Sequence, residues 1–118
     1  MNLQALSARV RTKDGVAVVE LAGDVDGSAE SALKAGYKEA AATGAATVLL
    51  DFGDVGYINS TGIALIVGLL AEARRDKRKV VAYGLSGHYR EIFQVTRLSD
   101  FMPIFADEHE ALADGAGR

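Results

Sequence analysis

Apolar residues along this 118-residue chain are spaced as in strands in some segments and as in helices in others, and the two kinds of segment alternate. Short runs of β-branched and aliphatic residues predict strands, and stretches rich in alanine, leucine and glutamate show helical spacing. The predicted strands are 3–10, 16–21, 47–52, 79–83 and 104–105. The predicted helices are 28–43, 61–76, 86–96 and 107–113. The order β-β-α-β-α-β-α-β-α predicts an α/β fold, a mixed and mostly parallel sheet with about four helices packed on it.

Turn and cap residues mark the boundaries of these segments. Lys13-Asp14-Gly15 carries the Asp-Gly pair that favours a tight hairpin, so the first two strands should be antiparallel. Gly44 is placed to end the first helix, and Ser86 is placed to begin the third. Helical spacing puts one face of the first helix inward, namely Ala29, Leu33, Gly36, Tyr37 and Ala40. The residues of the third helix expected to face inward are Tyr89, Ile92 and Phe93. Residues 115–118 are expected to form a flexible tail. The chain has no repeat and no linker, and we expect residues 1–118 to form one domain.

Two predicted loops follow strands at the same edge of the sheet. Residues 23–27 follow the second strand and residues 53–60 follow the third. Functional loops of such sheets gather beyond the carboxyl ends of the strands. We therefore expect these two loops to be neighbours and to carry the site.

The predicted helix 61–76 is apolar on nearly all sides at its start. Helical spacing predicts that one face packs on the sheet and a second apolar face points outward. The residues expected to face the sheet are Ile63, Ile66, Val67 and Leu70. The residues expected to face outward are Ala64, Leu65, Gly68 and Leu69. The outward face either packs against the third or the last helix or binds a partner protein.

Composition narrows the function classes. Apolar residues make up 49% of the chain and charged residues 25%, as in ordinary globular proteins. The formal charge of −3 argues against broad nucleic-acid binding. The chain lacks cysteine, which excludes disulfides and thiolate metal sites and fits a reducing cytoplasm. No signal peptide pattern is visible, and the longest apolar stretch is about half a membrane span, so we expect a cytoplasmic protein without direct membrane insertion.

Two adjacent hydroxyls, Ser60 and Thr61, lie where a buried strand is predicted to turn into a helix. Unpaired backbone N–H groups and a partial positive charge at a helix start favour a phosphate there. Ser60 is therefore a candidate charge switch. The alternative role of Ser60 is a plain helix cap. Gly62 is expected to permit close backbone approach, and the alternative is a role in local turn geometry.

Other polar residues give weaker signals. Asp51 lies in an apolar strand and is expected to have a structural hydrogen bond. Asp24 and Asp26 are candidates for partner docking or for presenting a kinase's ATP-bound metal, and the alternative is a role as turn or cap residues. His88 and His109 lack metal-ligand spacing, so no metal site is expected. The basic run 74–79 is typical of a solvated helix end. No G-x-S-x-G elbow, P-loop or dinucleotide fingerprint is present, and we expect no catalytic residue, no cofactor and no enzymatic activity.

Three segments together resemble a known family. Residues 48–62, with Val-Gly-Tyr-Ile followed by Asn59-Ser60-Thr61-Gly62, look like the signature of STAS domains. Residues 21–26 resemble the second-strand ending of that family, and residues 89–98 and 101–105 resemble its carboxyl-terminal part. More narrowly, the chain resembles bacterial anti-sigma factor antagonists over nearly its whole length. Asn59 departs from the family, which most often has aspartate there.

The resemblance implies a STAS-type domain that acts in partner switching. In that family the unphosphorylated antagonist binds an anti-sigma factor, usually a serine kinase, and so frees a sigma factor. Phosphorylation of the first hydroxyl of the motif, here Ser60 with Thr61 as second choice, ends the complex, and a phosphatase resets it. The expected partner-binding residues are Asp24, Asp26, Tyr57, Asn59, Ser60, Thr61, Gly62, Ala64, Leu65, Gly68 and Leu69.

Two other functions stay open from the sequence. STAS domains also serve as constitutive subunits of transporter ATPases and stress-signalling scaffolds, where Ser60 would only cap the helix. The family has also been linked to nucleotide binding, although this chain has no phosphate-cradling motif.

Overall fold

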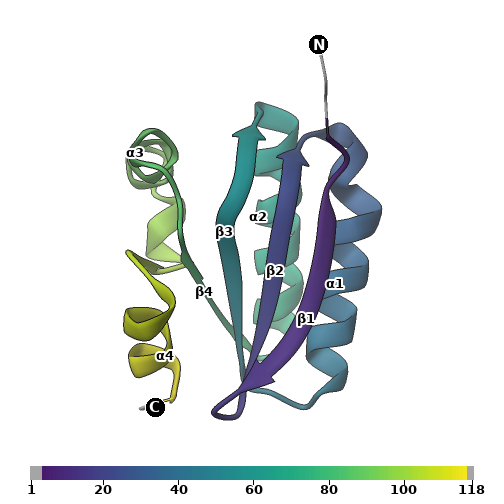
Figure 1. Cartoon of the computed structure of the whole chain (residues 1–118), viewed down its shortest axis with the longest axis vertical. Helices are drawn as coiled ribbons and strands as arrows, with labels where there is room; N and C mark the ends of the chain where they lie inside the picture. Colours follow the sequence, from purple (N-terminus) through teal and green to yellow (C-terminus); the bar gives the residue numbers. More distant parts are fainter. Residues whose placement is uncertain (1–3, 117–118) are drawn as a thin grey trace.

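The computed structural model describes residues 4–116 and has the predicted order of elements (Figure 1). The strands are β1 (Ser7–Lys13), β2 (Val16–Val25), β3 (Thr47–Ile58), β4 (Lys79–Tyr83) and β5 (Ile104–Phe105). The α-helices are α1 (Glu30–Ala42), α2 (Ser60–Arg75), α3 (Gly87–Val95) and α4 (Glu108–Ala116). Short 3₁₀ turns precede α1 and follow α3, namely η1 (Gly27–Ala29) and η2 (Leu98–Asp100). The predicted α/β fold is confirmed.

The five strands form one sheet in the order β1-β2-β3-β4-β5. β1 and β2 are antiparallel, and every other neighbouring pair is parallel. The hairpin between β1 and β2 turns at Asp14 and Gly15, with φ angles of 54° and 78°. Positive φ at both positions is the geometry that the Asp-Gly pair predicts.

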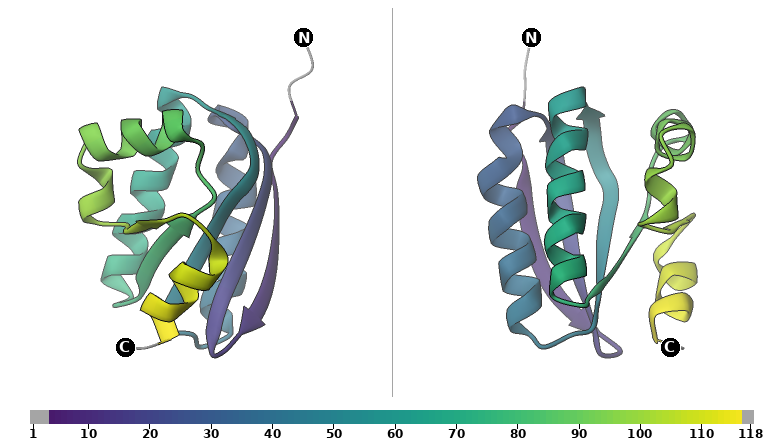
Figure 2. Two further views of the ribbon diagram at one scale, coloured as in Figure 1. Left: turned by 60° about the vertical axis from the view of Figure 1, so that its left-hand side comes forward. Right: turned by 180° about the vertical axis from the view of Figure 1, so that it is seen from behind.

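Helices cover both faces of the sheet. α1 and α2 lie side by side on one face, and α4 lies on the opposite face (Figure 2). Alternate residues of β2 divide between two cores, because successive side chains of a strand point to opposite faces. Ala17, Val19 and Leu21 belong to the larger core with α1 and α2, whereas Val16 and Val18 belong to the smaller core with α4.

The larger core confirms the predicted inner face of the first helix. The buried residues of η1 and α1 are Ala29, Leu33, Gly36, Tyr37 and Ala40. α3 joins the same core through Phe93, which is fully buried, while Tyr89 and Ile92 are half-buried. The Phe93 ring meets Phe52 of β3 edge-on, with ring centroids 6.2 Å apart.

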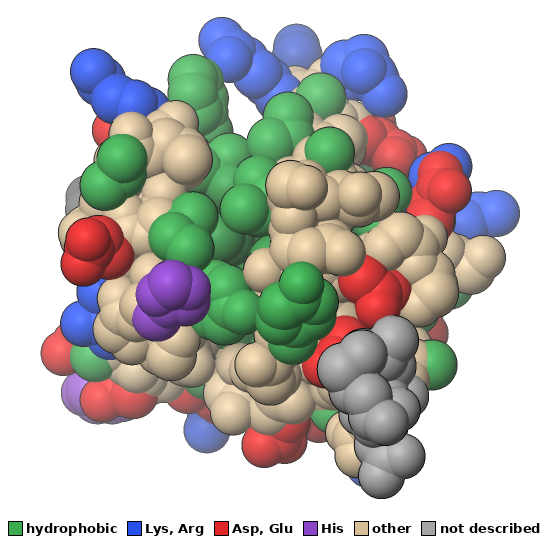
Figure 3. Space-filling model, turned by 90° about the horizontal axis from the view of Figure 1, so that it is seen from above, with side chains coloured by type: hydrophobic (Ala, Val, Ile, Leu, Met, Phe, Trp, Pro, Cys, Tyr) green, Lys and Arg blue, Asp and Glu red, His purple; other side chains and the backbone are tan. Residues whose placement is uncertain are grey.

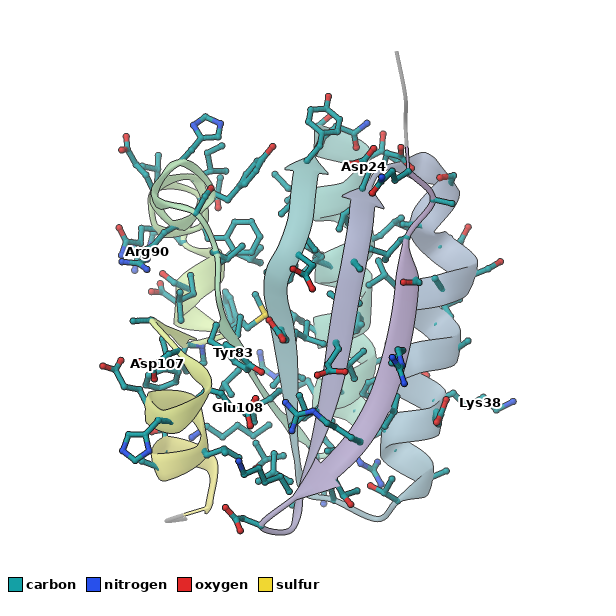
Figure 4. All side chains as sticks on the ribbon, in the orientation of Figure 1. Asp24, Lys38, Tyr83, Arg90, Asp107 and Glu108 are labelled. Atoms are coloured by element: carbon teal, nitrogen blue, oxygen red, sulfur yellow. The ribbon has the colours of Figure 1, made fainter. Side chains whose placement is uncertain are left out.

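Ionic contacts attach α4 to β1 and β4. The Arg11 guanidinium pairs with Glu108 of α4 and, at 3.0 Å, with Glu20. The Tyr83 hydroxyl donates a hydrogen bond of 2.7 Å to Glu108, and Lys13 Nζ lies 3.6 Å from the same carboxylate (Figure 4). The hydrogen bonds from Arg11 lower the pKa of Glu108 to about 2, despite the opposing effect of partial burial.

β2 and β3 are longer than predicted. The expected loops 23–27 and 53–60 are wrong in large part, because β2 continues to Val25 and β3 to Ile58. Two register shifts in the pairing each give β3 one residue more than β2. Such bulges interrupt the period-2 pattern, which conceals the second half of the strand in the sequence.

Asp51 has the structural role expected of it at the first bulge. Its carboxylate accepts a hydrogen bond of 2.8 Å from the Gly53 N–H.

The ends of the chain differ slightly from expectation. β1 begins at Ser7 rather than at residue 3, which lies outside the described residues. α4 continues through Ala116, so half of the expected tail is helical and residues 117 and 118 are not described.

Candidate functional site

The predicted site lies at one end of the molecule, where β2 and β3 end and α2 begins (Figure 1). Segments 23–27 and 53–60, which were expected to be neighbouring loops, do lie side by side, but they are in large part paired strands. Asp24 pairs in register with Tyr57, and Val25 pairs with Ile58. The Asn59 N–H then donates to the Val25 carbonyl at 3.2 Å, which carries the pairing to the start of α2.

Asn59, and not Ser60, is the N-cap of α2. Its side-chain oxygen accepts a hydrogen bond of 2.8 Å from the Gly62 N–H, and its carbonyl accepts one of 2.9 Å from Ile63. Ser60 is the first residue of the helix and is exposed. Its hydroxyl makes no hydrogen bond within residues 4–116. The capping role considered for Ser60 is therefore wrong, and its hydroxyl is available for chemistry.

Gly62 allows α2 to approach β2 more closely than any other residue could. It is buried, and a Cβ at this position would lie 1.9 Å from the Val25 carbonyl oxygen. The predicted reason for a glycine here, close backbone approach, is confirmed. This contact fixes the rotation of α2 about its axis and the exposed position of Ser60. Thr61, the second residue of the helix, is also exposed.

The rotation of α2 differs from the one predicted. Its buried residues are Gly62, Ile66, Leu69 and Ala73. Val67, expected to face the sheet, is 47% exposed, and Leu69, expected to face outward, is only 7% exposed. Both expectations are wrong, because a helix that is apolar on all sides carries no pattern that defines its inner face. Leu65 packs partly against the core beside α1.

The outward stripe of α2 nevertheless begins at Ser60 and is small and apolar. Its exposed members are Ser60, Thr61, Ala64, Val67, Gly68 and Ala71. Ala64 and Gly68 were expected to face outward, and both are exposed. Hydrophobic side chains gather over the middle of this end of the molecule in the space-filling view (Figure 3). Tyr57, near the end of β3, is 46% exposed.

The two aspartates of the predicted site have local partners. Asp24 accepts a hydrogen bond of 3.1 Å from the Gln4 N–H and lies at the end of β2 (Figure 4). Asp26 is the N-cap of η1 and accepts hydrogen bonds from the Ser28 hydroxyl at 2.5 Å and the Ser28 N–H at 2.9 Å. The bond from the Ser28 hydroxyl lowers the pKa of Asp26, which therefore stays ionised. The predicted capping role of Asp26 is confirmed.

Tyr89 of α3 belongs to the site, although the sequence indicated only that it faces inward. Its hydroxyl accepts a hydrogen bond of 3.0 Å from the Ile58 N–H, two residues before Ser60. β4 pairs only with residues 47–51 of β3, so the tyrosine hydroxyl satisfies an N–H that no strand meets. The His88 ring contacts the Tyr89 ring, with centroids 4.9 Å apart. Nothing in the sequence pattern distinguishes this tyrosine from an ordinary core residue.

The described part of the chain holds neither a cluster of metal-ligating side chains nor a helix that could cross a membrane. Residues 4–116 contain no group of three or more His, Cys, Asp or Glu side chains that could hold a metal ion. Within the same residues, no helix has both the length and the hydrophobicity that crossing a membrane requires.

The sequence that forms this fold matches a known family. The family model described as "Mlab, STAS domain" matches residues 8–104, and the chain therefore belongs to the STAS domain family. The anti-sigma-B factor antagonist of Listeria monocytogenes is 33% identical over 67 residues. That match covers 57% of this chain and 59% of the relative, which is less than two thirds of the relative's length.

Two solved structures share the fold. An anti-sigma factor antagonist from Mycobacterium paratuberculosis has a TM-score of 0.76 at 22% identity, with 94% of each chain covered. The Bacillus cell fate determinant SpoIIAA, solved in its phosphorylated form, has a TM-score of 0.67 at 24% identity, with 92% of this chain and 98% of that chain covered. At these identities the two structures bear on the fold alone.

Proposed function

We propose that this protein is an anti-sigma factor antagonist controlled by phosphorylation of Ser60. In the unphosphorylated form it binds an anti-sigma factor that is also a serine kinase, through the exposed stripe of α2 and Tyr57. Phosphorylation of Ser60 by that kinase ends the complex, and a serine phosphatase restores binding. Thr61 is the second candidate acceptor. The Listeria relative named as an anti-sigma-B factor antagonist supports the class of partner.

The observation that carries this proposal is the state of the Ser60 hydroxyl. Ser60 is exposed at the first position of α2, and Asn59 performs the capping that would otherwise occupy a serine there. The hydroxyl has no hydrogen-bonding partner among residues 4–116. A phosphate on it would lie at the positive end of the helix dipole, so the modified protein should stay folded.

The surroundings of Ser60 explain how a phosphate would act on binding. The stripe that begins at Ser60 presents Ala64 and Val67 to a partner, which is a contact that depends on excluding water. A phosphate adds about −1.5 to −2 charges at the rim of that contact. Asp24, near the end of the neighbouring strand, and Asp26, directly after that strand, place two further carboxyl groups beside this contact. A partner bound to the unmodified surface would therefore have to desolvate the added phosphate or dissociate.

Charge substitutions at Ser60 test the proposal with the anti-sigma kinase encoded in the same genome. We expect Ser60→Ala to bind with an affinity within about 3-fold of the original and Ser60→Asp to weaken binding by at least about 100-fold, which corresponds to about 2.7 kcal/mol. Ala35→Asp is the matched control, because it adds the same charge at an exposed position of α1. Calorimetry without ATP measures all four proteins. Equal binding by Ser60→Asp and the original protein would contradict the switch and would favour a constitutive subunit.

A further inference from the structure

A groove separates the carboxyl-terminal half of α2 from η2. It shares Val67 and Ala71 with the exposed stripe of α2 and extends from there away from Ser60. Its volume is about 750 Å³, and its floor includes Ala73, Val80 and Leu98, all of which are buried. Figure 2 shows β4 running between α2 and the segment that follows α3, so this strand passes beneath the groove. The floor is therefore formed by the larger core itself.

The walls of the groove expose large apolar side chains. Phe101, directly after η2, is 63% exposed, and Val67 on α2 is 47% exposed. Leu70 and Ala71 complete the apolar part of the α2 wall. An aromatic ring held in water beside a concave apolar surface is typical of a binding site, where such residues supply most of the affinity.

The charged residues around the groove are mostly basic. Arg74, Lys77, Arg78 and Lys79 line it, against the single acidic residue Asp100. Asp100 is engaged by Arg97 at 2.8 Å.

The four basic side chains differ in how far they are engaged. Lys79 pairs with Asp114, and Arg78 donates to the carbonyls of Ala41 and Ala45. Arg74 and Lys77 are exposed and have no ion pair within residues 4–116. The helix dipole explains why cations occur at the end of α2, but it does not explain the apolar wall beside them. The groove is thus locally positive on a chain of net charge −3.

We propose that this groove is a second docking site, which binds an acidic amphipathic helix of a partner protein. The exposed and half-buried α2 residues that line it recur at 67, 70, 71 and 74, which makes one stripe about 10 Å long, enough for about two turns of a partner helix. Lys77 lies just beyond the end of α2 and extends the basic edge of the groove. Apolar residues of that helix would contact Phe101 and Val67, and its acidic residues would lie near Arg74 and Lys77. The concave shape favours a helix over a flat lipid surface, and the net negative charge of the chain opposes binding to anionic lipid.

The test uses a synthetic amphipathic helix with leucine on one face and glutamate on the other. The control peptide has lysine in place of every glutamate. In an NMR titration of the full chain, we expect the acidic peptide alone to cause saturable shifts at Val67, Leu70 and Phe101. Substitution at an exposed side chain should leave the fold intact, so we expect Phe101→Ala to weaken binding by at least about 10-fold.

Two adjacent arginines of α2 provide a matched pair. Arg74 lines this groove, whereas Arg75 lines the groove on the α1 side. We expect Arg74→Glu to weaken binding of the acidic peptide by about 10-fold and Arg75→Glu by less than about 2-fold.

Equal effects of the two substitutions would overturn the proposal, as would equal binding of both peptides or the absence of saturable shifts. Tighter binding to anionic vesicles than to the peptide would assign the groove to a membrane instead, and self-association through it would assign it to a second copy of the chain. Ser60 is unchanged throughout, so the outcome does not depend on the phosphorylation switch.

Discussion

The same substitution at two glycines of α2 should have opposite effects on stability. Gly62 and Gly68 lie two turns apart in one helix, and glycine in a helix interior costs up to about 1 kcal/mol relative to alanine. A Cβ on Gly68 would meet no atom within 4 Å, so Gly68→Ala should gain nearly all of that free energy. A Cβ on Gly62 would lie 1.9 Å from the Val25 oxygen and 2.6 Å from its carbonyl carbon.

The size of the loss at Gly62 follows from that distance. Real Cβ atoms do not approach other atoms within 3.0 Å, and the obstacle is backbone rather than a flexible side chain. The start of α2 must therefore move away from β2 by about 1 Å, a shift comparable to those that cost about 1–3 kcal/mol in overpacked cores. The movement also weakens the bond from the Asn59 N–H to Val25. We expect Gly62→Ala to lower the free energy of unfolding by about 2–3 kcal/mol.

Urea denaturation followed by circular dichroism measures both variants against the original protein. We expect the transition midpoint to rise for Gly68→Ala and to fall for Gly62→Ala, with an unchanged slope of free energy against urea concentration. A Gly62→Ala protein as stable as the original would refute the inference that close contact with Val25 fixes the start of α2. An increase in stability for both variants would refute it as well.

Substitutions at three further positions test contacts described above. Asn59→Ala should lower the free energy of unfolding by about 1 kcal/mol through loss of the α2 cap, whereas Asn59→Asp should retain the cap, as urea titrations would show. Tyr89→Phe leaves the Ile58 N–H unpaired and should cost about 1–2 kcal/mol and speed hydrogen exchange at Ile58. Glu108 has its folded-state pKa lowered from 4.5 to about 2, so its stabilising effect is complete above pH 4.5 and disappears as the pH falls toward 2. Glu108→Gln should therefore destabilise the protein by about 2 kcal/mol at pH 7 and by much less near pH 2, a comparison that thermal unfolding across this range would make.

The sequence predicted the order of elements because each strand and helix has its own local signal. The Asp-Gly pair at 14–15 and the apolar face of α1 each point to one structure, and both are found. The extension of β3 to Ile58 was not predictable from periodicity, since two bulges put Gly53 and Gly56 where alternating apolar residues would be expected. Strand pairing that depends on such bulges is a tertiary property.

The proximity of the two strand ends to the start of α2 was predictable, and the exposed face of α2 was less so. The Ser60 motif and the neighbouring strand ends were located from the sequence, but the exposed face of α2 was not, because Val67 and Leu69 are equally apolar. The close contact between Gly62 and Val25, a tertiary feature, accompanies a rotation of α2 that buries Leu69 and exposes Val67. Tyr89 was missed as a site residue because its hydrogen bond joins segments 31 residues apart in the chain.

The most direct test of the phosphorylation switch is to add ATP to the complex of this protein with its anti-sigma kinase. Native mass spectrometry would record, in one experiment, whether phosphate appears on Ser60 and whether the complex persists. We predict that phosphate accumulates on Ser60 and that the complex disappears at the same rate, with neither change in the Ser60→Ala protein. A complex that survives full phosphorylation of Ser60, or one that dissociates without it, would contradict the account.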